Sequence, residues 1–448
     1  MMAKHYDVII IGGGPAGIFA ALELVQASEL DILLIEKGGD IDERTNLVCG
    51  LGGAGAFSDG KLTLSSQVGG RLGEYAGESE TETLIKYVND TYMRFGASDK
   101  VYGAGGEADI WQAKARLADL NLVPVPVRHL GTEACRTVLT AMRDHLSPRL
   151  ELRLESAAAT IVTDSDRVQG IRTETGERFD CRYLIIAPGR EGSDWLYREA
   201  QRLNLTMHIN PVDVGVRVEL PAAVLEELTR VLYEVKLEFT TKSFNDRIRT
   251  FCMCPHGEVI TESTGGYDPV ITVNGHSYTN RMTNNTNFAL LMSTTFTEPF
   301  REPIAYGKYL ARLANILSGG VLLQRLGDLL SGHRSTPARI EEGSVRPTLK
   351  NAIPGDLSFV LPYRQLTGIM EMLRAMDKLA PGVASPHTLL YGVEVKFYST
   401  RPRLSPKLET EVSNMFTAGD GAGISRGLVQ ASASGVIVAR EILERVKS

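Results

Sequence analysis

The sequence predicts an α/β fold in which a Rossmann-like dinucleotide-binding domain is discontinuous along the chain and a mixed α+β domain is inserted into it. A strand-like run near residue 6 leads into a glycine-rich turn and a helix. A strand, a turn and a helix of small residues close the chain at 412–439. Between them, runs of alternating polar and apolar residues are typical of sheet strands. We expect residues 1–190 to form the first part of the binding domain, 191–400 the inserted domain and 401–448 the return.

The first motif joins a strand to a helix through glycines. Residues 6–11, YDVIII, have the β-branched character of a strand buried on both faces. Gly12, Gly14 and Gly17 follow with the spacing G-x-G-x-x-G, which gives a tight turn, a close approach to a pyrophosphate and close packing of helix on strand. A helix that begins near Pro15 directs its N-terminal N–H groups at the phosphates.

An acidic residue completes this motif. The run DILLIE ends in Glu36, about 20 residues beyond the glycines, where a carboxylate accepts hydrogen bonds from ribose hydroxyls. The same carboxylate disfavours the 2′-phosphate of NADP. An ordinary β-turn-α unit with a solvated glutamate is the alternative, but strand, glycines, helix, second strand and acid together favour dinucleotide binding.

Composition and charge exclude several classes of protein. The chain has 448 residues, 43% of them hydrophobic, and a net charge of -6, so it can bury a large core and lacks the basic field of a general nucleic-acid binder. Its five cysteines are odd in number and mostly scattered, which fits a reducing cytosol rather than a disulfide framework. Asp7 precedes the apolar N-terminal run, and the glycines and Pro15 interrupt it. We therefore expect a soluble cytoplasmic protein with no signal peptide and no membrane span.

The C-terminal segment VSNMFTAGDGAGISRGLVQASASGVIVA, residues 412–439, has a turn at Gly419 and Asp420 before a helix rich in Ala, Ser and Gly. It resembles the C-terminal flavin motif of the two-dinucleotide-binding-domain flavoproteins, the glutathione-reductase-like superfamily. The resemblance implies that Asp420 binds the ribityl hydroxyls of FAD. It also implies that the helix directs its N-terminus at the pyrimidine edge of the flavin, where its dipole stabilises negative charge.

A third segment, RFDCRYLIIAPGRE at 178–191, resembles the A-T-G segment that closes over the cofactor in that superfamily. Pro188 stands before Gly189 where threonine is usual, so the threonine hydroxyl is absent. The order and spread of the three segments match the superfamily and imply FAD as the cofactor.

The glycine-rich stretch CGLGGAGAFSDGKLTL, residues 49–64, narrows the chemistry. Disulfide reductases of the superfamily carry two cysteines separated by four residues just after the second strand. Here Cys49 is present but Ala54 stands five positions on, so dithiol chemistry is not expected. No second G-x-G-x-x-G follows a strand in the middle of the chain. NAD(P)H would therefore bind transiently as an electron donor, or the electrons come from elsewhere.

The segment GGAGAFSDGKL also closely resembles a poorly characterised family described as FAD-dependent dehydrogenases. Further fragments of that resemblance are FCMCPHGEVI at 251–260, VNGHSYTNRMTNNTNFALLMS at 273–293 and GVEVKFYSTRPRL at 392–404. The family name states a cofactor and a redox class but no substrate. Motifs and resemblance together place these residues at FAD: Gly12, Gly14, Pro15, Ala16, Gly17, Glu36, Lys37, Arg44, Gly52, Gly53, Ala54, Gly55, Ser58, Lys61, Pro188, Gly189, Gly419, Asp420 and Gly423.

We expect the inserted domain to bind the substrate. Runs such as VDVGVRVEL and PVITVNGHSYTN predict a mixed or antiparallel sheet that caps the flavin. His276, Tyr278 and Asn280 would share one face of a strand, while Arg281 would face the other. A structural hydrogen-bond network is one interpretation of this polar run, and a substrate site is the other.

Two further pairs of residues have more than one interpretation. Arg401 and Arg403 share a face, and they either hold a substrate carboxylate or stabilise the domain junction. Cys252 and Cys254 form a C-x-C, which in an extended strand places both side chains on one face. They are first interpreted as small buried residues and second as a redox pair. No metal site is expected, because no second C-x-C or paired histidines complete a ligand set.

The predicted function is that of an FAD-dependent oxidoreductase, a dehydrogenase or reductase that transfers a hydride between flavin N5 and a small organic substrate. Lys61 and Arg281 are the catalytic candidates. Lys61, with Asp59, lies in the loop expected to reach the flavin, although a plain loop salt bridge is the alternative for Lys61. A flavin monooxygenase and an FAD-dependent tRNA-modifying enzyme are the other functions considered. We expect no nucleic-acid or membrane partner, and an oligomer is compatible with the sequence.

Overall fold

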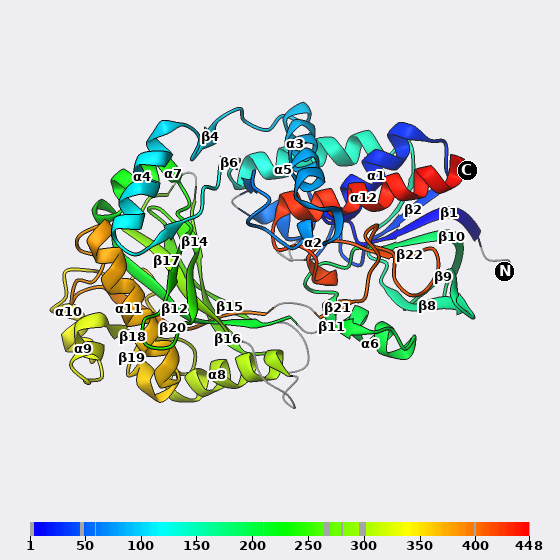
Figure 1. Cartoon of the computed structure of the whole chain (residues 1–448). Helices are drawn as coiled ribbons and strands as arrows, with labels where there is room; N and C mark the ends of the chain where they lie inside the picture. The colour runs from blue at the N-terminus through cyan, green and yellow to red at the C-terminus, as the bar shows by residue number, and fades with distance from the viewer. Residues whose placement is uncertain are drawn as a thin grey trace. The chain divides into compact units, whose positions relative to one another are not determined.

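The computed structural model of the protein describes residues 4–44, 49–58, 60–208, 210–263, 269–278, 281–294, 302–397 and 400–447. The chain forms two compact units (Figure 1). The first unit comprises residues 1–100, 128–210 and 399–448, and the second comprises 101–127 and 211–398. The observed boundaries differ from the expected ones, since 101–127 lies in the second unit and 191–210 in the first.

The first unit is built on a sheet with parallel central strands. Its strands are β1 (Lys4–Ile11), β2 (Ile32–Ile35), β7 (Glu151–Arg153), β8 (Ala158–Asp164), β9 (Arg167–Thr173), β10 (Arg178–Ile186) and β22 (Met415–Thr417). The order is β7-β2-β1-β10-β9-β8, with β22 paired to β10. The pairs β1–β2, β1–β10 and β10–β22 are parallel. Parallel strands of this kind are covered on both faces, which explains the continuous apolar run of β1. The predicted α/β class is confirmed.

Helices and short elements complete the first unit. The helices are α1 (Pro15–Ala27), α2 (Gly73–Ala76), α3 (Glu78–Arg94), α5 (Thr132–Leu146), α6 (Ser193–Arg202) and α12 (Leu428–Lys447). The short elements are η1 (Gly53–Phe57), η4 (Asp420–Ala422), β3 (Lys61–Thr63), β11 (Met207–His208) and β21 (Arg401–Pro402), while β4 (Val101–Tyr102) and β6 (Val127–His129) lie at the ends of segment 101–127.

Helices α1 and α12 lie side by side, drawn in blue and red in Figure 1. A Cβ on Gly435 would lie 2.0 Å from the carbonyl oxygen of Ala16 and 3.1 Å from the nitrogen of Ala20. Only glycine permits this approach, because both neighbours are backbone atoms. The small residues of α12 therefore serve its packing against the helix that follows the first glycine turn.

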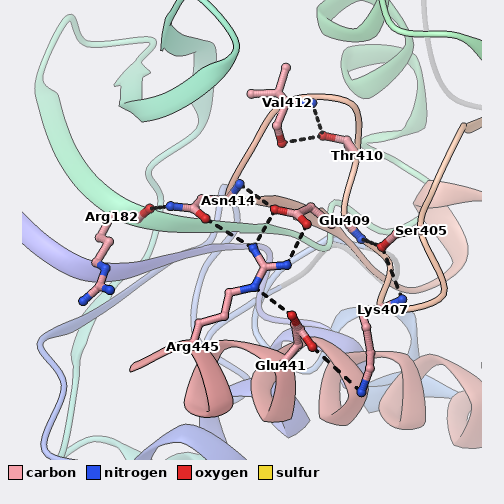
Figure 2. Close-up of polar contacts among 9 residues, drawn as sticks. All are labelled: Arg182, Ser405, Lys407, Glu409, Thr410, Val412, Asn414, Glu441 and Arg445. Atoms are coloured by element: carbon pink, nitrogen blue, oxygen red, sulfur yellow. Dashed lines mark hydrogen bonds and ion pairs between the residues drawn. The ribbon is translucent and has the colours of Figure 1, made fainter. Parts of the chain in front are cut away.

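The C-terminal end of α12 is held by the polar network in Figure 2. Arg445 donates two hydrogen bonds of 2.7 Å to the carboxylate of Glu409 and one of 2.7 Å to Glu441. Glu441 also lies 3.8 Å from the ammonium of Lys407. Asn414 donates through Nδ2 to the backbone carbonyl of β10 at Arg182. The network joins α12 to the segment that leads into β22.

The second unit is built on a largely antiparallel sheet. In order across the sheet, its strands are β19 (Ile353–Pro354), β18 (Leu322–Arg325), β20 (Leu389–Lys396), β12 (Val212–Pro221), β17 (Asn285–Thr294), β14 (Arg247–Cys254), β13 (Leu237–Thr240) and β5 (Asn121–Leu122). Pairing of β5 with β13 explains why segment 101–127 belongs to this unit. A separate hairpin consists of β15 (Glu258–Ser263) and β16 (Ile271–His276).

The helices of the second unit are α4 (Gly106–Leu117), α7 (Glu226–Leu232), α8 (Pro303–Ser318), α9 (Leu326–Leu330), α10 (Pro337–Glu341) and α11 (Tyr363–Leu379), with short turns η2 (Ala222–Val224) and η3 (Leu357–Phe359). Among the helices of the described residues, none combines the length and the apolar run that crossing a membrane requires.

The two faces of this sheet differ in polarity, as the alternation of β12 predicts. Val214, Val216 and Val218 belong to a core that includes Ile369 and Met372 of α11. The alternate residues form the opposite face, which we call the polar face: Asp213, Gly215, Arg217 and Glu219 of β12, with their register partners on β17 and β20.

A buried carboxylate, Asp328, fixes the turn after β18. Asp328 accepts hydrogen bonds from Arg325 at 3.0 Å, Ser335 at 2.6 Å and Arg339 at 2.7 Å. Burial alone would raise the pKa of Asp328, but these donors outweigh it and lower the pKa from 3.8 to about 2. The carboxylate therefore stabilises the folded state in its charged form.

Candidate functional site

Four loops of the first unit meet at one edge of its sheet. Because β1, β2, β10 and β22 are parallel, their carboxyl ends lie at the same edge. The loops that follow these strands start at Gly12, Glu36, Ala187 and Ala418. The structure thus places the three separate sequence motifs together.

The space over the first turn of α1 is lined by bare backbone. A Cβ on Gly12 would lie 2.0 Å from the carbonyl oxygen of Ala187, and one on Gly17 would lie 1.9 Å from that of Gly12. A Cβ on Gly14 would meet nothing nearer than the Cα of Gly53, at 3.9 Å. Gly12 and Gly17 are therefore required for packing, whereas Gly14 borders open space. Backbone N–H groups beside such a space at a helix N-terminus suit a phosphate.

Glu36 connects three of these loops. Its Oε2 accepts the N–H of Gly13 at 2.9 Å, and its Oε1 accepts the N–H groups of Gly38 at 2.9 Å and Gly50 at 3.1 Å. The Cys49 thiol lies 3.7 Å from Oε1, and burial followed by the charge of Glu36 raises the pKa of that thiol. Oε1 takes three of these contacts and Oε2 only one. Because each carboxylate oxygen has about two acceptor sites, Oε2 retains capacity for a ribose hydroxyl while Glu36 orders the loops.

Arg44 organises the glycine-rich stretch. Its guanidinium donates to the carbonyl oxygens of Leu51 at 2.7 Å and Gly53 at 2.9 Å. Burial lowers the pKa of Arg44, and the charge of Glu36 partly offsets this effect. The N–H of Gly52 in turn donates to the carbonyl of Gly13 at 2.8 Å. The stretch is thus held against the first glycine turn.

The loops after β10 and β22 also touch. A Cβ on Gly421 would lie 2.1 Å from the carbonyl oxygen of Gly189, the residue after Pro188. Gly189 has a φ of +62°, and a Cβ there would meet no atom within 4 Å. Lys37, after β2, lies 3.7 Å from the carboxylate of Glu191. Lys37 is therefore engaged in an ion pair that links two of the loops.

Asp420 lies in the turn before α12. Its Oδ1 accepts the hydroxyl of Ser425 at 2.6 Å, and the side chain is half-buried. The N–H of Gly419 donates to the Ser434 hydroxyl at 2.9 Å, and Gly423 ends the turn with a φ of +72°. These contacts fix the direction of Asp420 at the sheet edge.

Gln430 is a buried residue of this region that sequence reasoning missed. Its Oε1 accepts the N–H of Leu72 at 3.2 Å, and its Nε2 donates to the carbonyls of Ser66 at 3.2 Å and Val68 at 3.1 Å. Gln430 thereby joins the loop after β3 to the first turn of α12. The sequence feature that could have indicated Gln430 is its single amide side chain among the small residues of RGLVQASASG.

The loop expected to reach the flavin is ordered by its own turn. The Ser58 hydroxyl donates to the carbonyl of Gly55 at 3.0 Å and accepts the N–H of Gly60 at 3.2 Å. Lys61 begins β3 and is half-buried. Asp59 lies outside the described residues.

The polar run predicted as a substrate site in the second unit does not form one continuous strand. His276 ends β16, so Tyr278 does not continue the strand, and their ring centroids lie 4.5 Å apart. Arg281 is 68% exposed and pairs with Glu258 at 2.6 Å. Asn280 lies outside the described residues. The described part of this run forms a surface cluster at the open end of the hairpin.

Arg401 lies in the first unit. Its NH1 group donates to Glu74 at 2.9 Å and to the Tyr75 hydroxyl at 3.0 Å. Burial alone would lower the pKa of Arg401, but the contacts with Glu74 and Tyr75 outweigh it and raise the pKa. Arg403 is exposed and lies 3.9 Å from Glu411. Both side chains have acidic neighbours within the first unit.

The C-x-C of β14 departs from the expected geometry. Cys252 has a φ of +36°, and the register of β14 against β17 shifts between Phe251 and Cys254. The alternation of faces is interrupted, so the expectation that Cys252 and Cys254 share a face as in a regular strand is wrong. Cys254 is buried and Cys252 is half-buried, and neither forms a disulfide within the described residues.

Comparison with protein families identifies the class. The model of the FAD binding domain matches residues 7–69, which contain the first glycine turn, Glu36 and Arg44. The model of the FAD-dependent protein, C-terminal domain-like, matches residues 211–397. Both matches support FAD as the cofactor of this chain, as predicted. The matches also confirm the resemblance to FAD-dependent proteins.

An uncharacterised protein of Clostridium beijerinckii is 27% identical over 481 residues, which cover 98% of this chain and 80% of the relative. Among solved structures, glycine oxidase from Geobacillus kaustophilus is 15% identical with a TM-score of 0.42, covering 99% of this chain and 95% of its own. The 3-ketosteroid-delta4-(5alpha)-dehydrogenase from Rhodococcus jostii RHA1 is 13% identical with a TM-score of 0.46, covering 98% and 97%.

Proposed function

We propose that the protein transfers a hydride between flavin N5 and a small organic substrate, with FAD held by the first unit and the substrate by the second. The observation that carries this proposal is the meeting of four loops at the carboxyl ends of β1, β2, β10 and β22. Ligands of open α/β sheets bind at such an edge.

The proposed roles follow from the position of each group at this edge. The N–H groups at the start of α1, beside Gly14 and Gly53, bind the pyrophosphate. Glu36 binds a ribose hydroxyl with its remaining acceptor capacity. Asp420 binds the ribityl chain, and the positive end of the α12 dipole faces the pyrimidine edge. When bound, FAD supplies the hydride chemistry, and the chain supplies binding, orientation and charge.

The remaining assignments are also proposals. Lys61 is assigned to the flavin side, since it follows the turn at Ser58 that adjoins η1. The substrate is a small molecule rather than a nucleic acid, which the net charge of -6 supports. None of the five cysteines forms a disulfide within the described residues, which agrees with a cytoplasmic protein.

The test is a reduction and reoxidation experiment on the purified flavoprotein. The protein is reduced under anaerobic conditions, and small organic oxidants are added singly while the flavin absorbance is followed. Recovery of oxidised flavin with a defined organic acceptor, in a one-to-one ratio to product, supports hydride transfer. Reoxidation by oxygen alone, with hydroxylation of the substrate, would replace this proposal with a monooxygenase.

A further inference from the structure

The polar face of the second unit is an unusual surface for a buried sheet, because ionised side chains occupy it. Arg217, Glu394 and Asp213 are fully buried there. Burying charges is costly unless each is paired and hydrogen-bonded. The pairing of these groups therefore indicates which parts of the face are structural and which lack a partner.

The inner part of the polar face is structural. Arg217 donates to both carboxylate oxygens of Glu394, at 2.7 and 2.9 Å, and to the Oδ1 of Asn287 at 2.7 Å. The β16 strand covers it closely, since a Cβ on Gly275 would lie 2.2 Å from Arg217. Glu219 lies further along β12, where it accepts from Tyr391 at 2.5 Å. These groups are enclosed, and their polar atoms are hydrogen-bonded within the face. The exception is Asn287 Nδ2, which has no partner among the described residues.

The outer end of the polar face, where β12 begins, is different. Asp213 accepts hydrogen bonds from the Ser293 hydroxyl and from Arg249 at 3.0 Å. Its register partner across the strand pair is Lys396, so these side chains lie about 5 Å apart at Cβ on one face. Arg249 is 24% exposed and Lys396 18% exposed, so both cations reach solvent while their carboxylate neighbour is enclosed.

The cations at this end are incompletely paired. Lys396 shares Glu394, at 3.1 Å, with Arg217, and its other neighbour Glu262 lies 3.8 Å away and is 38% exposed. Burial alone would lower the pKa of Lys396, but Glu394 and Glu262 outweigh it and raise the pKa, so the ammonium remains charged. The Nε of Arg249 is buried and has no hydrogen-bond partner among the described residues.

The carboxylates nearest to these two cations, Asp213 and Glu394, are fully buried, so this end presents mainly its cations to solvent. Glu219 adds no negative charge here, because it stands six residues from Asp213 along β12, a separation of roughly 20 Å in an extended strand. An oxygen-bearing anion arriving from solvent would accept from the exposed part of the Arg249 guanidinium and neutralise Lys396 together.

We infer that Arg249 and Lys396, flanking Asp213, form a subsite for the carboxylate of an organic substrate. The inference deepens the proposed function and rests on it, since it names the class of substrate as a small carboxylic acid. Ser293 and Phe251 position the arginine: the hydroxyl of Ser293 accepts from Arg249 at 3.1 Å, and the guanidinium carbon lies 4.8 Å from the Phe251 ring centroid.

The test measures binding to the FAD-loaded protein by calorimetry at constant ionic strength. The probes are acetate, benzoate and succinate, each compared with its uncharged amide. We expect the carboxylates to bind and their amides to bind about tenfold more weakly or not at all, since a charge-assisted hydrogen bond is lost. Equal binding of acids and amides, or binding of neither, would overturn the inference without any variant.

Variants locate the subsite. Lys396→Met should weaken benzoate binding about tenfold or more, and it leaves Glu394 paired with Arg217. Arg249→Met should act in the same direction. The matched control is Arg247→Met, two residues earlier on β14, where the arginine is exposed and pairs with Glu238 at the surface. An equal loss in the Arg247 variant, or no loss in Lys396→Met, would contradict the assignment.

The flavin chemistry is measured separately on the same proteins. Reoxidation of the reduced flavin by ferricyanide should proceed in Arg247→Met as in the wild-type protein, because Arg247 is exposed and pairs with Glu238 at the surface. If carboxylates bind but no organic acceptor reoxidises the flavin, the proposed function fails while the subsite stands. If an uncharged acceptor reoxidises the flavin and carboxylates do not bind, the subsite fails alone.

Discussion

Substituting Gly435 by alanine tests the close approach of α1 and α12. Alanine is favoured over glycine within a helix by about 1 kcal/mol, so Gly435→Ala would stabilise an unconstrained helix. Here the new Cβ would lie 2.0 Å from the carbonyl oxygen of Ala16 and 3.1 Å from the nitrogen of Ala20. Since both are backbone atoms, the helices must separate by about 1 Å, and tightly packed interiors resist such shifts.

Overpacking costs about 1–3 kcal/mol and more when backbone must move, which exceeds the gain in helix propensity. We expect a net loss of about 1–2 kcal/mol and a fall of about 2–8 °C in the melting temperature of the first unit. The assay measures the temperature at which heating releases FAD, followed by flavin fluorescence. The FAD content after gel filtration is a second readout. A displaced α12 should also lower the retained FAD.

The matched control is Gly106→Ala in α4, where a Cβ would meet no atom within 4 Å. It should leave the FAD release temperature unchanged. An unchanged or higher release temperature in Gly435→Ala, with full FAD content, would refute the close packing of α1 on α12.

Three other predictions concern single contacts. Gln430→Leu should cost about 1–3 kcal/mol of unfolding free energy, because the buried N–H of Leu72 and the part-buried carbonyls of Ser66 and Val68 lose their partner. Urea titration measures the loss, and a wild-type midpoint would contradict it. The pKa of Asp328 is lowered to about 2. The carboxylate therefore stabilises the folded state by about 2 kcal/mol above about pH 4, and this contribution is lost as the pH falls toward 2. Asp328→Asn should remove that part of the acid dependence in denaturant titrations. Arg445→Met should cost about 1–2 kcal/mol near neutral pH. Burial alone would raise the pKa of Glu409, but Arg445 outweighs it and lowers the pKa, so the loss should be smaller in acid, where protonation of Glu409 ends the pairing. Equal losses at both pH values would count against this pair.

The first binding motif could be predicted because its information is local. The strand of residues 6–11, the glycines and Glu36 occupy one short stretch of sequence, and each has a steric or hydrogen-bonding reason for its position. Gly12 and Gly17 indeed leave no room for a side chain. The return at 412–439 could be placed beside it only through the resemblance, since the pairing of β22 with β10 joins residues far apart in sequence.

Contacts that depend on tertiary pairing escaped prediction. Segment 101–127 joins the second unit through the two-residue strand β5, too short to give a periodic signal. The outer end of the polar face was missed because Arg249, Asp213 and Lys396 come from three separate strands. Cys252 was misjudged because a positive φ within a strand has no sequence signature outside glycine.

The central claim, that FAD binds over the first turn of α1, is tested most directly by the affinity of Gly14→Val for FAD. Gly14 has a φ of -79° and a ψ of -175°, which valine adopts readily, and a Cβ there has no neighbour nearer than 3.9 Å. The apoprotein should therefore fold with wild-type stability while the valine fills the phosphate space. Titration of FAD into the apoprotein should show affinity reduced roughly 100-fold, equivalent to about two charge-assisted hydrogen bonds. Wild-type affinity in a folded Gly14→Val protein would contradict the placement of the cofactor.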